Sequence, residues 1–241
     1  MRVCTGTSGY AYKEWKGTFY PEKLPAAEFL RYYGTQFPTV EINNTFYRMP
    51  TEKLLLQWAD QVPDGFRFVL KASQKITHFK RLKDVGDELG YFVRTATALG
   101  DKLGPTLVQL PPNMKKDLPR LADFLALFPP RWKTAVEFRH ASWLEDDVFA
   151  ALRARDAALC VADTDEGGAT PFVRTADDAY LRLRRTDYDE SALRAWAERI
   201  AAQSPKRAWV YFKHEDEALA PRFARQLADI WRATVVQDAA R

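Results

Sequence analysis

Charged and amide side chains recur at the ends of short apolar runs in this sequence of 241 residues. Carboxylates and amines in such positions suit general acid–base chemistry, and arginines suit the binding of carboxylates or phosphates. The pattern contains three acids, three bases and two amides, namely Glu41, Glu137, Asp163, Lys71, Arg139, Arg182, Asn43 and Gln109. It therefore predicts a polar site for an anionic ligand.

The apolar runs have the composition of buried β-strands, and longer segments with helical periodicity lie between them. We predict eight strands, at Val3–Gly6, Thr39–Asn43, Arg67–Lys71, Thr106–Gln109, Thr134–Phe138, Ala158–Ala162, Tyr180–Leu183 and Ala208–Phe212. We predict helices at Glu52–Gln61, Tyr91–Leu99, Leu118–Leu127, Asp147–Arg155, Ser191–Gln203 and Pro221–Ala233. A repeat of about 30 residues is typical of a (β/α)8 barrel. The fold class is therefore α/β, with residues 1–241 forming a single TIM-barrel-like domain.

A doubly wound open sheet is the alternative fold. Such sheets usually carry a glycine-rich phosphate turn after the first strand. The segment Gly6-Thr7-Ser8-Gly9 is a tight turn, but it lacks the G-x-G-x-x-G spacing. The sequence therefore favours the barrel.

Strand periodicity predicts where the polar residues point. Side chains alternate between the two faces of a strand, so Glu137 and Arg139 share one face, and Arg182 lies opposite its two leucine neighbours. The apolar face must contact the helices, which leaves the polar face towards the barrel axis. We therefore expect seven residues to converge at the carboxyl ends of the strands, where barrel active sites form: Glu41, Lys71, Gln109, Glu137, Arg139, Asp163 and Arg182. A self-neutralising ion-pair network that only closes the barrel is the alternative.

Each residue type in this set suits a different role. Arg139, Arg182 and Lys71 would hold an anion. Glu137 or Glu41 would transfer protons, provided that one carboxylate has a raised pKa. Lys71 could instead be the amine of a Schiff base. The side chains of Gln109, Asn43 and Asp163 would orient the substrate. The first hypothesis is therefore an enzyme that acts on a phosphate- or carboxylate-bearing small molecule.

Nucleic-acid binding, or a nuclease activity, is the second hypothesis. The segment from Lys71 to Lys83 is basic and contains Phe79, and the pI is about 9.0 with a net charge of +4. Interleaved basic and aromatic side chains can bind a nucleic-acid backbone and stack on its bases. The carboxyl ends of the strands surround the mouth of the barrel, and around this mouth we also expect Tyr10, Tyr12, Trp15, Tyr47 and Trp143. A barrel that binds a ligand without catalysis is the third hypothesis.

A metal site is disfavoured, and we expect no cofactor. His78, His140 and His214 each follow a predicted strand, but no H-x-H or H-E-x-x-H pattern occurs. The cations matched to the three acids would also repel a divalent ion. Surface or structural roles are therefore the simpler interpretation of the histidines.

The composition excludes several classes of protein. With 46% hydrophobic and 28% charged residues the chain is globular, and no apolar run is long enough to span a membrane. The sequence from Met1 enters a predicted strand directly, so we expect no signal peptide. Cys4 and Cys160 are far apart in apolar segments, as is typical of reduced, buried thiols. We therefore expect a cytoplasmic protein with no membrane partner, and the sequence leaves its oligomeric state open.

Several blocks of the sequence resemble the YecE-like family, also called domain of unknown function seventy-two. The blocks are Gly6–Tyr10, Trp15–Pro21, Val40–Tyr47, Phe68–Ser73, Gln109–Pro112 and Glu137–Trp143. The resemblance implies a TIM-barrel-like fold and no settled activity. Carried over residue by residue, it implies functional positions at Thr7, Ser8, Glu41, Asn43, Tyr47, Lys71, Thr77, His78, Gln109, Glu137, Arg139, His140, Trp143, Asp163 and Arg182.

Overall fold

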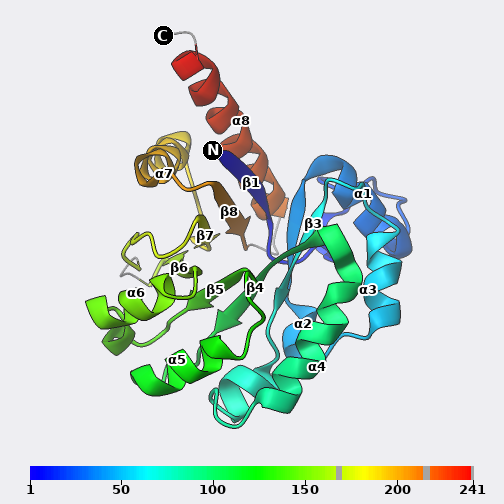
Figure 1. Cartoon of the computed structure of the whole chain (residues 1–241). Helices are drawn as coiled ribbons and strands as arrows, with labels where there is room; N and C mark the ends of the chain where they lie inside the picture. Colours follow the sequence, from blue (N-terminus) through cyan, green and yellow to red (C-terminus); the bar gives the residue numbers. More distant parts are fainter. Residues whose placement is uncertain (167–169, 214–217, 240–241) are drawn as a thin grey trace.

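Eight parallel strands form one sheet at the centre of the computed structural model, which describes residues 1–166, 170–213 and 218–239. The strands are β1 (Arg2–Thr7), β2 (Thr39–Ile42), β3 (Arg67–Lys71), β4 (Leu103–Gln109), β5 (Thr134–Glu137), β6 (Ala157–Asp163), β7 (Asp178–Leu183) and β8 (Arg207–Phe212). Their order around the sheet is β1-β8-β7-β6-β5-β4-β3-β2 (Figure 1). All eight predicted strands and the α/β barrel class are confirmed.

The barrel is nearly closed between β1 and β2. Ser8 follows β1 and forms a parallel bridge with Glu41 of β2. Farther from the carboxyl ends, the hydroxyl of Tyr33 lies between the two strands. It accepts a hydrogen bond from the backbone N–H of Thr7 at 2.9 Å and donates one to the carbonyl oxygen of Thr39 at 3.1 Å. One side chain thus replaces part of the missing backbone ladder and satisfies two buried peptide groups.

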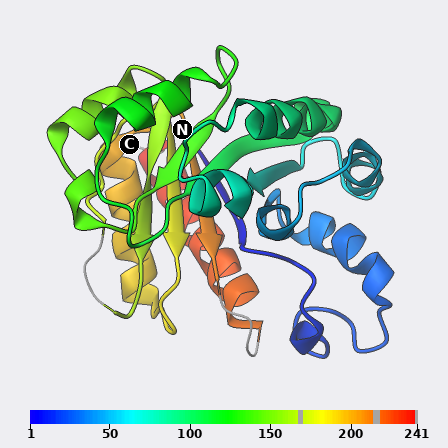
Figure 2. The same ribbon diagram turned by 90° about the horizontal axis from the view of Figure 1, so that it is seen from below.

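Helices cover the outer surface of the barrel (Figure 2). They are α1 (Phe29–Gln36), α2 (Asn44–Tyr47), α3 (Glu52–Ala59), α4 (Gly86–Ala96), α5 (Leu118–Ala126), α6 (Asp146–Arg153), α7 (Glu190–Gln203) and α8 (Leu219–Ala239). Helices α3, α5 and α7 are each preceded by a polar N-cap residue, Thr51, Asp117 and Asp189, whose side chain accepts a backbone N–H group of the helix. The six predicted helices correspond to α3 to α8, whose first or last residues differ from the predicted ones.

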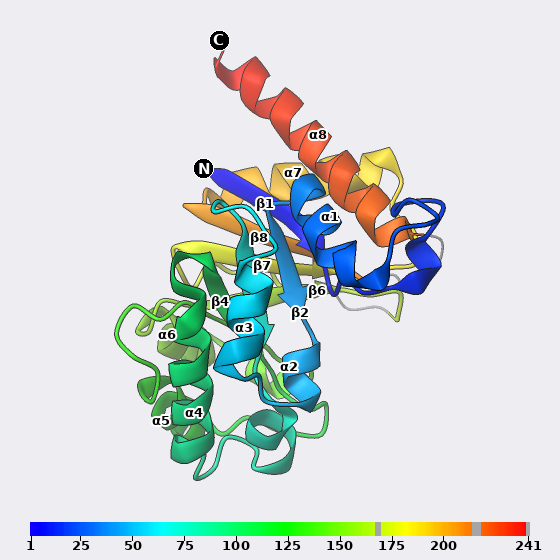
Figure 3. The ribbon, with the colours of Figure 1, turned by 90° about the vertical axis from the view of Figure 1, so that its right-hand side faces the viewer.

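Helices α1 and α2 are absent from the sequence prediction. Helix α1 contains Gly34 and several aromatic residues, which have low helix propensity, and α2 has only four residues. Between β6 and β7, residues 164–166 and 170–177 form no helix. Helix α8 contacts β1, β8 and α7, and its C-terminal end projects beyond the other helices (Figure 3).

Apolar side chains fill two layers, one between strands and helices and one inside the barrel. The inner layer consists of Cys4, Val69, Leu107, Ala135, Ala158, Cys160, Tyr180, Trp209 and Tyr211. Both cysteines are buried and unpaired, as predicted. Glu137 lies two residues after Ala135, and Arg182 lies two residues after Tyr180, so both charged side chains point inward as well. None of the helices within the described ranges is long and apolar enough to cross a membrane.

Candidate functional site

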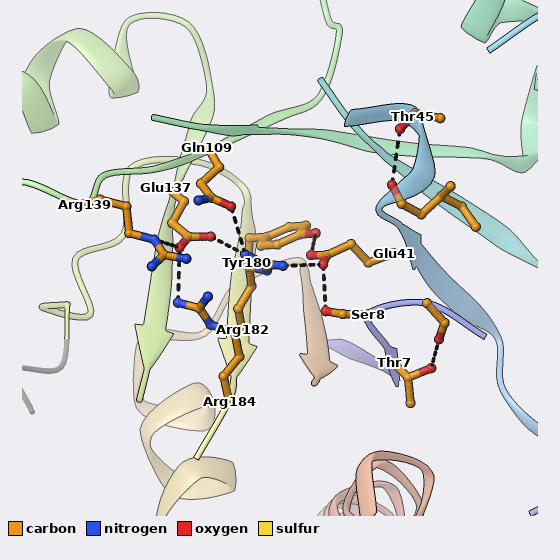
Figure 4. Close-up of polar contacts among 12 residues, drawn as sticks. Thr7, Ser8, Glu41, Thr45, Gln109, Glu137, Arg139, Tyr180, Arg182 and Arg184 are labelled. Atoms are coloured by element: carbon orange, nitrogen blue, oxygen red, sulfur yellow. Dashed lines mark hydrogen bonds and ion pairs between the residues drawn. The ribbon is translucent and has the colours of Figure 1, made fainter. Parts of the chain in front are cut away.

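Arg182 of β7 links two buried carboxylates at the carboxyl end of the barrel (Figure 4). Its Nη2 donates to Oε1 of Glu41 at 2.8 Å, and its Nη1 donates to Oε2 of Glu137 at 2.6 Å. The same Nη1 lies 3.4 Å from Oε1 of Gln109. Both glutamates are fully buried, and Arg182 is 2% exposed. Strands β2, β4, β5 and β7 thus bring these four predicted residues together.

Glu41 is held by two side chains of β7 and by Ser8, which follows β1. Besides Arg182, Ser8 donates its hydroxyl to Oε1 at 2.7 Å, and Tyr180 donates to Oε2 at 2.6 Å. Burial raises the pKa of Tyr180, and the charge of Glu41 raises it further, so the phenol stays protonated as a donor. Tyr180 is absent from the predicted set. Its place two residues before Arg182, on the same strand face, is the signal that could have found it.

Glu137 is surrounded by three guanidinium groups. Besides Arg182, Arg139 donates from Nε to Oε1 at 2.5 Å, and Arg184 approaches the same oxygen with Nη2 at 3.3 Å. Burial alone would raise the pKa of Glu137, but the charges of Arg182, Arg184 and Arg139 lower it to about 2. Glu137 is therefore ionised at neutral pH. The raised carboxylate pKa required for its predicted acid–base role is not found at this residue.

Asp163 lies outside this cluster, contrary to the sequence prediction. Its Oδ2 accepts hydrogen bonds from the hydroxyl of Tyr188 at 2.9 Å and from Nε1 of Trp196 at 3.2 Å. Trp196 belongs to α7, so Asp163 faces the helical layer. The prediction is wrong because Asp163 shares its strand face with Val161 of the outer core, whereas Cys160 belongs to the inner layer.

The cluster at the mouth carries a surplus of positive charge. Without Asp163 and with Arg184, it contains four cations (Lys71, Arg139, Arg182, Arg184) and two carboxylates (Glu41, Glu137), or 4 − 2 = +2. Burial lowers the pKa of Arg184; Glu137 opposes this effect, and the neighbouring Arg182 and Arg139 strengthen it. The buried Nε atoms of Arg182 and Arg184 have no hydrogen-bond partner among the described residues. The mouth therefore has unused donors and an uncompensated charge.

Lys71 ends β3 beside this cluster. Its carbonyl oxygen accepts a hydrogen bond from the hydroxyl of Thr45 at 2.7 Å, and its Nζ lies 4.0 Å from the ring centre of Phe46. Across the described ranges, the ammonium group forms no hydrogen bond or ion pair. Burial and the charge of Arg182 lower the pKa of Lys71 to about 8, although Glu41 and Glu137 oppose the shift. Lys71 therefore titrates close to neutral pH.

Two predicted histidines lie beyond the central cluster. His78 belongs to a π-helix at Lys75–Phe79; its Nδ1 is 2.8 Å from the Thr77 hydroxyl, and its ring packs edge-on against Phe46. Burial and the charge of Lys71 lower the pKa of His78, which keeps the ring neutral at pH 7. His140 accepts the backbone N–H of Ser142 at 3.2 Å and so caps a short 3-10 helix.

The remaining predicted positions are spread over the rim and the core. Thr7 belongs to the seam between β1 and β2. Asn43 lines a hollow of about 100 Å³ together with Tyr10 and Tyr12. Tyr47 is 71% exposed on α2.

The expectation of aromatic side chains around the mouth is wrong for two tryptophans. Trp15 and Trp143 are both fully buried. Trp143 stacks on Phe138 and donates its Nε1–H to the carbonyl oxygen of Met114 at 2.7 Å. Both indoles are therefore parts of the core.

Metal ligation has no candidate within the part of the chain that the structure describes. There, no three His, Cys, Asp or Glu side chains are grouped so that they could hold an ion. His214, the third predicted histidine, lies outside the described residues.

Besides a hollow of about 500 Å³ beside the C-terminal ends of α5 and α6, two more hollows lie away from the mouth. One of about 450 Å³ opens at the amino ends of the strands and is lined by Arg2, Arg131, Lys133, Lys206 and Arg207, among others. Its lysines pair with Asp156 and Asp177. The other, of about 550 Å³, is mainly apolar and lies between α2 and α3. Neither contains the buried, unpartnered donors that distinguish the mouth.

Comparison with known proteins identifies the family. Residues 4–240 match the family described as "Protein of unknown function DUF72". The chain belongs to the DUF72 family. The resemblance to YecE-like proteins, predicted from the sequence blocks, is thereby confirmed.

Two bacterial relatives illustrate the spread of the DUF72 family. The UPF0759 protein YecE of Escherichia coli K12 is 33% identical over 112 residues, which cover 46% of this chain and 41% of YecE. The UPF0759 protein YunF of Bacillus subtilis is 26% identical over 182 residues, covering 70% of this chain and 64% of YunF. The matched part thus spans less than half of YecE and less than two thirds of YunF.

Solved structures of DUF72 proteins have the same fold. A DUF72 family protein from Thermotoga maritima superimposes with a TM-score of 0.82 at 28% identity, covering 96% of this chain and 100% of the other. A DUF72 family protein from Enterococcus faecalis gives a TM-score of 0.80 at 17% identity, covering 95% of each chain. The second likeness shows the fold alone.

Proposed function

We propose that the mouth of the barrel binds a small anionic substrate, bearing a phosphate or a carboxylate, and transforms it by acid–base chemistry. The surplus charge of +2 in the cluster at the mouth carries this proposal. Unpaired buried cations are costly, and a bound anion would compensate them. Charge-assisted hydrogen bonds to guanidinium groups would also give the anion a defined orientation.

The residues at the mouth divide into two groups. Arg182 donates hydrogen bonds to Glu41 and Glu137 and would hold these two carboxylates in position. Arg139 and Arg184 each use one nitrogen on Glu137 and keep other N–H groups for a ligand. Lys71, with a pKa of about 8, is the group best suited to donate or accept a proton near neutral pH.

A small anion fits the structure better than a nucleic acid does. In the basic segment, Lys75 and Lys80 both form ion pairs with Glu88, at 2.9 Å each, which reduces their charge towards a polyanion. The burial of Trp15 and Trp143 also removes two of the aromatic rings expected for base stacking.

Thermal unfolding in the presence of anions tests the proposal. Inorganic phosphate and a panel of phosphorylated and carboxylated metabolites should raise the Tm, by an amount equivalent to about 2.7 kcal/mol at a hundredfold excess over Kd. Arg184→Gln should abolish most of the increase. The matched control is Arg194→Gln, since Arg194 is an exposed residue of α7 paired with Glu190 at 2.5 Å. No increase in the wild type, or an equal increase in Arg184→Gln, would overturn anion binding at the mouth.

Further outcomes would decide between the three hypotheses. Salt-sensitive binding of single-stranded RNA or DNA that phosphate does not displace would favour the nucleic-acid alternative. A ligand that binds tightly and is recovered unchanged, with no turnover of any related compound, would favour a non-catalytic barrel. Conversion of a bound ligand, lost in Lys71→Met, would support the enzyme.

A further inference from the structure

We propose that Lys71 is a nucleophilic amine that forms a Schiff base with a carbonyl group of the substrate. The inference rests on the proposed anion site and narrows its substrate class to aldehydes or ketones that also carry a phosphate or carboxylate. It assigns a covalent step to the mouth, in addition to binding and proton transfer.

The surroundings of Lys71 separate it from other lysines. The residue is 8% exposed, and its Nζ packs over the face of Phe46 instead of pairing with a carboxylate. In the following loop, Lys75 and Lys80 are both tied to Glu88. Lys71 thus combines burial with an unpaired amine, the combination that makes a lysine nucleophilic.

The charges around Lys71 favour its neutral form. Burial opposes the ammonium, and the positive charges of Arg182 and Arg139 oppose it further. Glu41 and Glu137 act in the other direction, but both are already bound to guanidinium groups. Close to pH 8 about half of the Lys71 side chains would carry a free lone pair, the form that attacks a carbonyl carbon.

The covalent step needs no external oxidant or reductant. The neutral amine adds to the carbonyl carbon and forms a C–N bond, and one amine hydrogen moves to the oxygen to give a carbinolamine. The second amine hydrogen then leaves with that hydroxyl as water, and a C=N double bond remains. Arg139 and Arg184, which face the same mouth, would hold the anionic group of the substrate during both stages.

Borohydride trapping with pyridoxal phosphate, an aldehyde that carries a phosphate, tests this inference. The reduced adduct should add one phosphopyridoxyl group per chain, and peptide mapping should place it on Lys71. The rate of labelling should rise with pH and reach half of its maximum near pH 8. Lys71→Arg should lose the adduct, whereas the control Lys75→Arg should retain it. Labelling confined to other lysines in the wild type, where folding is not in question, would overturn the inference.

Two further measurements separate failure of this inference from failure of the anion site. If phosphate raises the Tm and Arg184→Gln removes the effect, but Lys71 stays unlabelled, the anion site stands and the nucleophile is disproved. If pyridoxal without a phosphate labels Lys71 as fast as pyridoxal phosphate does, the amine is reactive but the anionic substrate class is wrong. Faster labelling by pyridoxal phosphate, slowed by Arg184→Gln or by added phosphate, is the expected result.

Discussion

At the residue scale, the central feature is a buried arginine shared by two buried glutamates. Arg182 bonds Glu41 and Glu137, and all three side chains are withdrawn from water. Burying such a group requires desolvation that the ion pairs only partly offset, and apolar side chains of similar size are often at least as stable. The unpartnered Nε of Arg182 and the additional cations around it are the observations that support the proposed anion site.

Glu137→Gln should destabilise the protein in a pH-dependent way. At pH 7 the substitution leaves three guanidinium groups without their shared carboxylate and should lower the free energy of unfolding by about 3–5 kcal/mol. The folded-state pKa of Glu137 is about 2, against 4.5 in an unstructured chain. The carboxylate therefore stabilises the fold fully above pH 4.5, and about 3 kcal/mol of this is lost as the pH falls towards 2.

Denaturant titrations from pH 7 to pH 2 measure this effect. The difference between the wild type and Glu137→Gln should narrow over the acid range. The control Glu190→Gln removes an exposed ion pair with Arg194 and should cost less than about 1 kcal/mol at pH 7. A difference that stays constant down to pH 2 would disprove the lowered pKa of Glu137.

At the element scale, the seam between β1 and β2 determines how Ser8 reaches Glu41. The strands approach closely at Gly6, where a Cβ atom would lie 2.2 Å from the carbonyl oxygen of Thr39. The hydroxyl of Tyr33 joins Thr7 and Thr39 at the same level. Closure of the barrel therefore depends on a residue without a side chain and on one inserted hydroxyl.

Gly6→Ala should open this seam. The added methyl group collides with backbone, which cannot move without separating β1 from β2, so we expect a loss of about 3 kcal/mol in the free energy of unfolding. Gly86→Ala is the matched control, because a Cβ atom there meets nothing within 4 Å, and it should be neutral or stabilising by about 0.5 kcal/mol. Hydrogen exchange at the amide of Thr7 should accelerate in Gly6→Ala and stay unchanged in Gly86→Ala. Equal stability of the two variants would show that the seam tolerates a side chain.

At the scale of the whole molecule, the barrel could be predicted because its strands are apolar on both faces and evenly spaced. The alternation of side chains between the two faces of each strand correctly placed Glu41, Gln109, Glu137 and Arg182 at one mouth of the barrel. Alternation excludes Asp163 from the mouth, because this residue ends β6 on the face of Val161 and not on the inward face of Cys160.

Other features depend on tertiary contacts that local sequence does not encode. Trp15 and Trp143 each follow a predicted strand, where residues of the rim are expected. Packing against distant segments buries both of them. The lowered pKa of Lys71 likewise arises from burial and from charges on other strands. The surplus of positive charge follows from two contacts that the structure shows: Arg184 pairs with Glu137, and Asp163 bonds Trp196 outside the cluster.

Crystals soaked in tungstate, a heavy analogue of phosphate, offer the most direct test of an anion site at the mouth. The anomalous signal locates the ion without assuming any substrate. Binding at the mouth predicts a peak within hydrogen-bond distance of Arg184 and Arg139, on the side that Lys71 faces, and its absence in Arg184→Gln crystals. A peak only in the basic hollow at the amino ends of the strands, beside Arg2, Arg131 and Arg207, would contradict it.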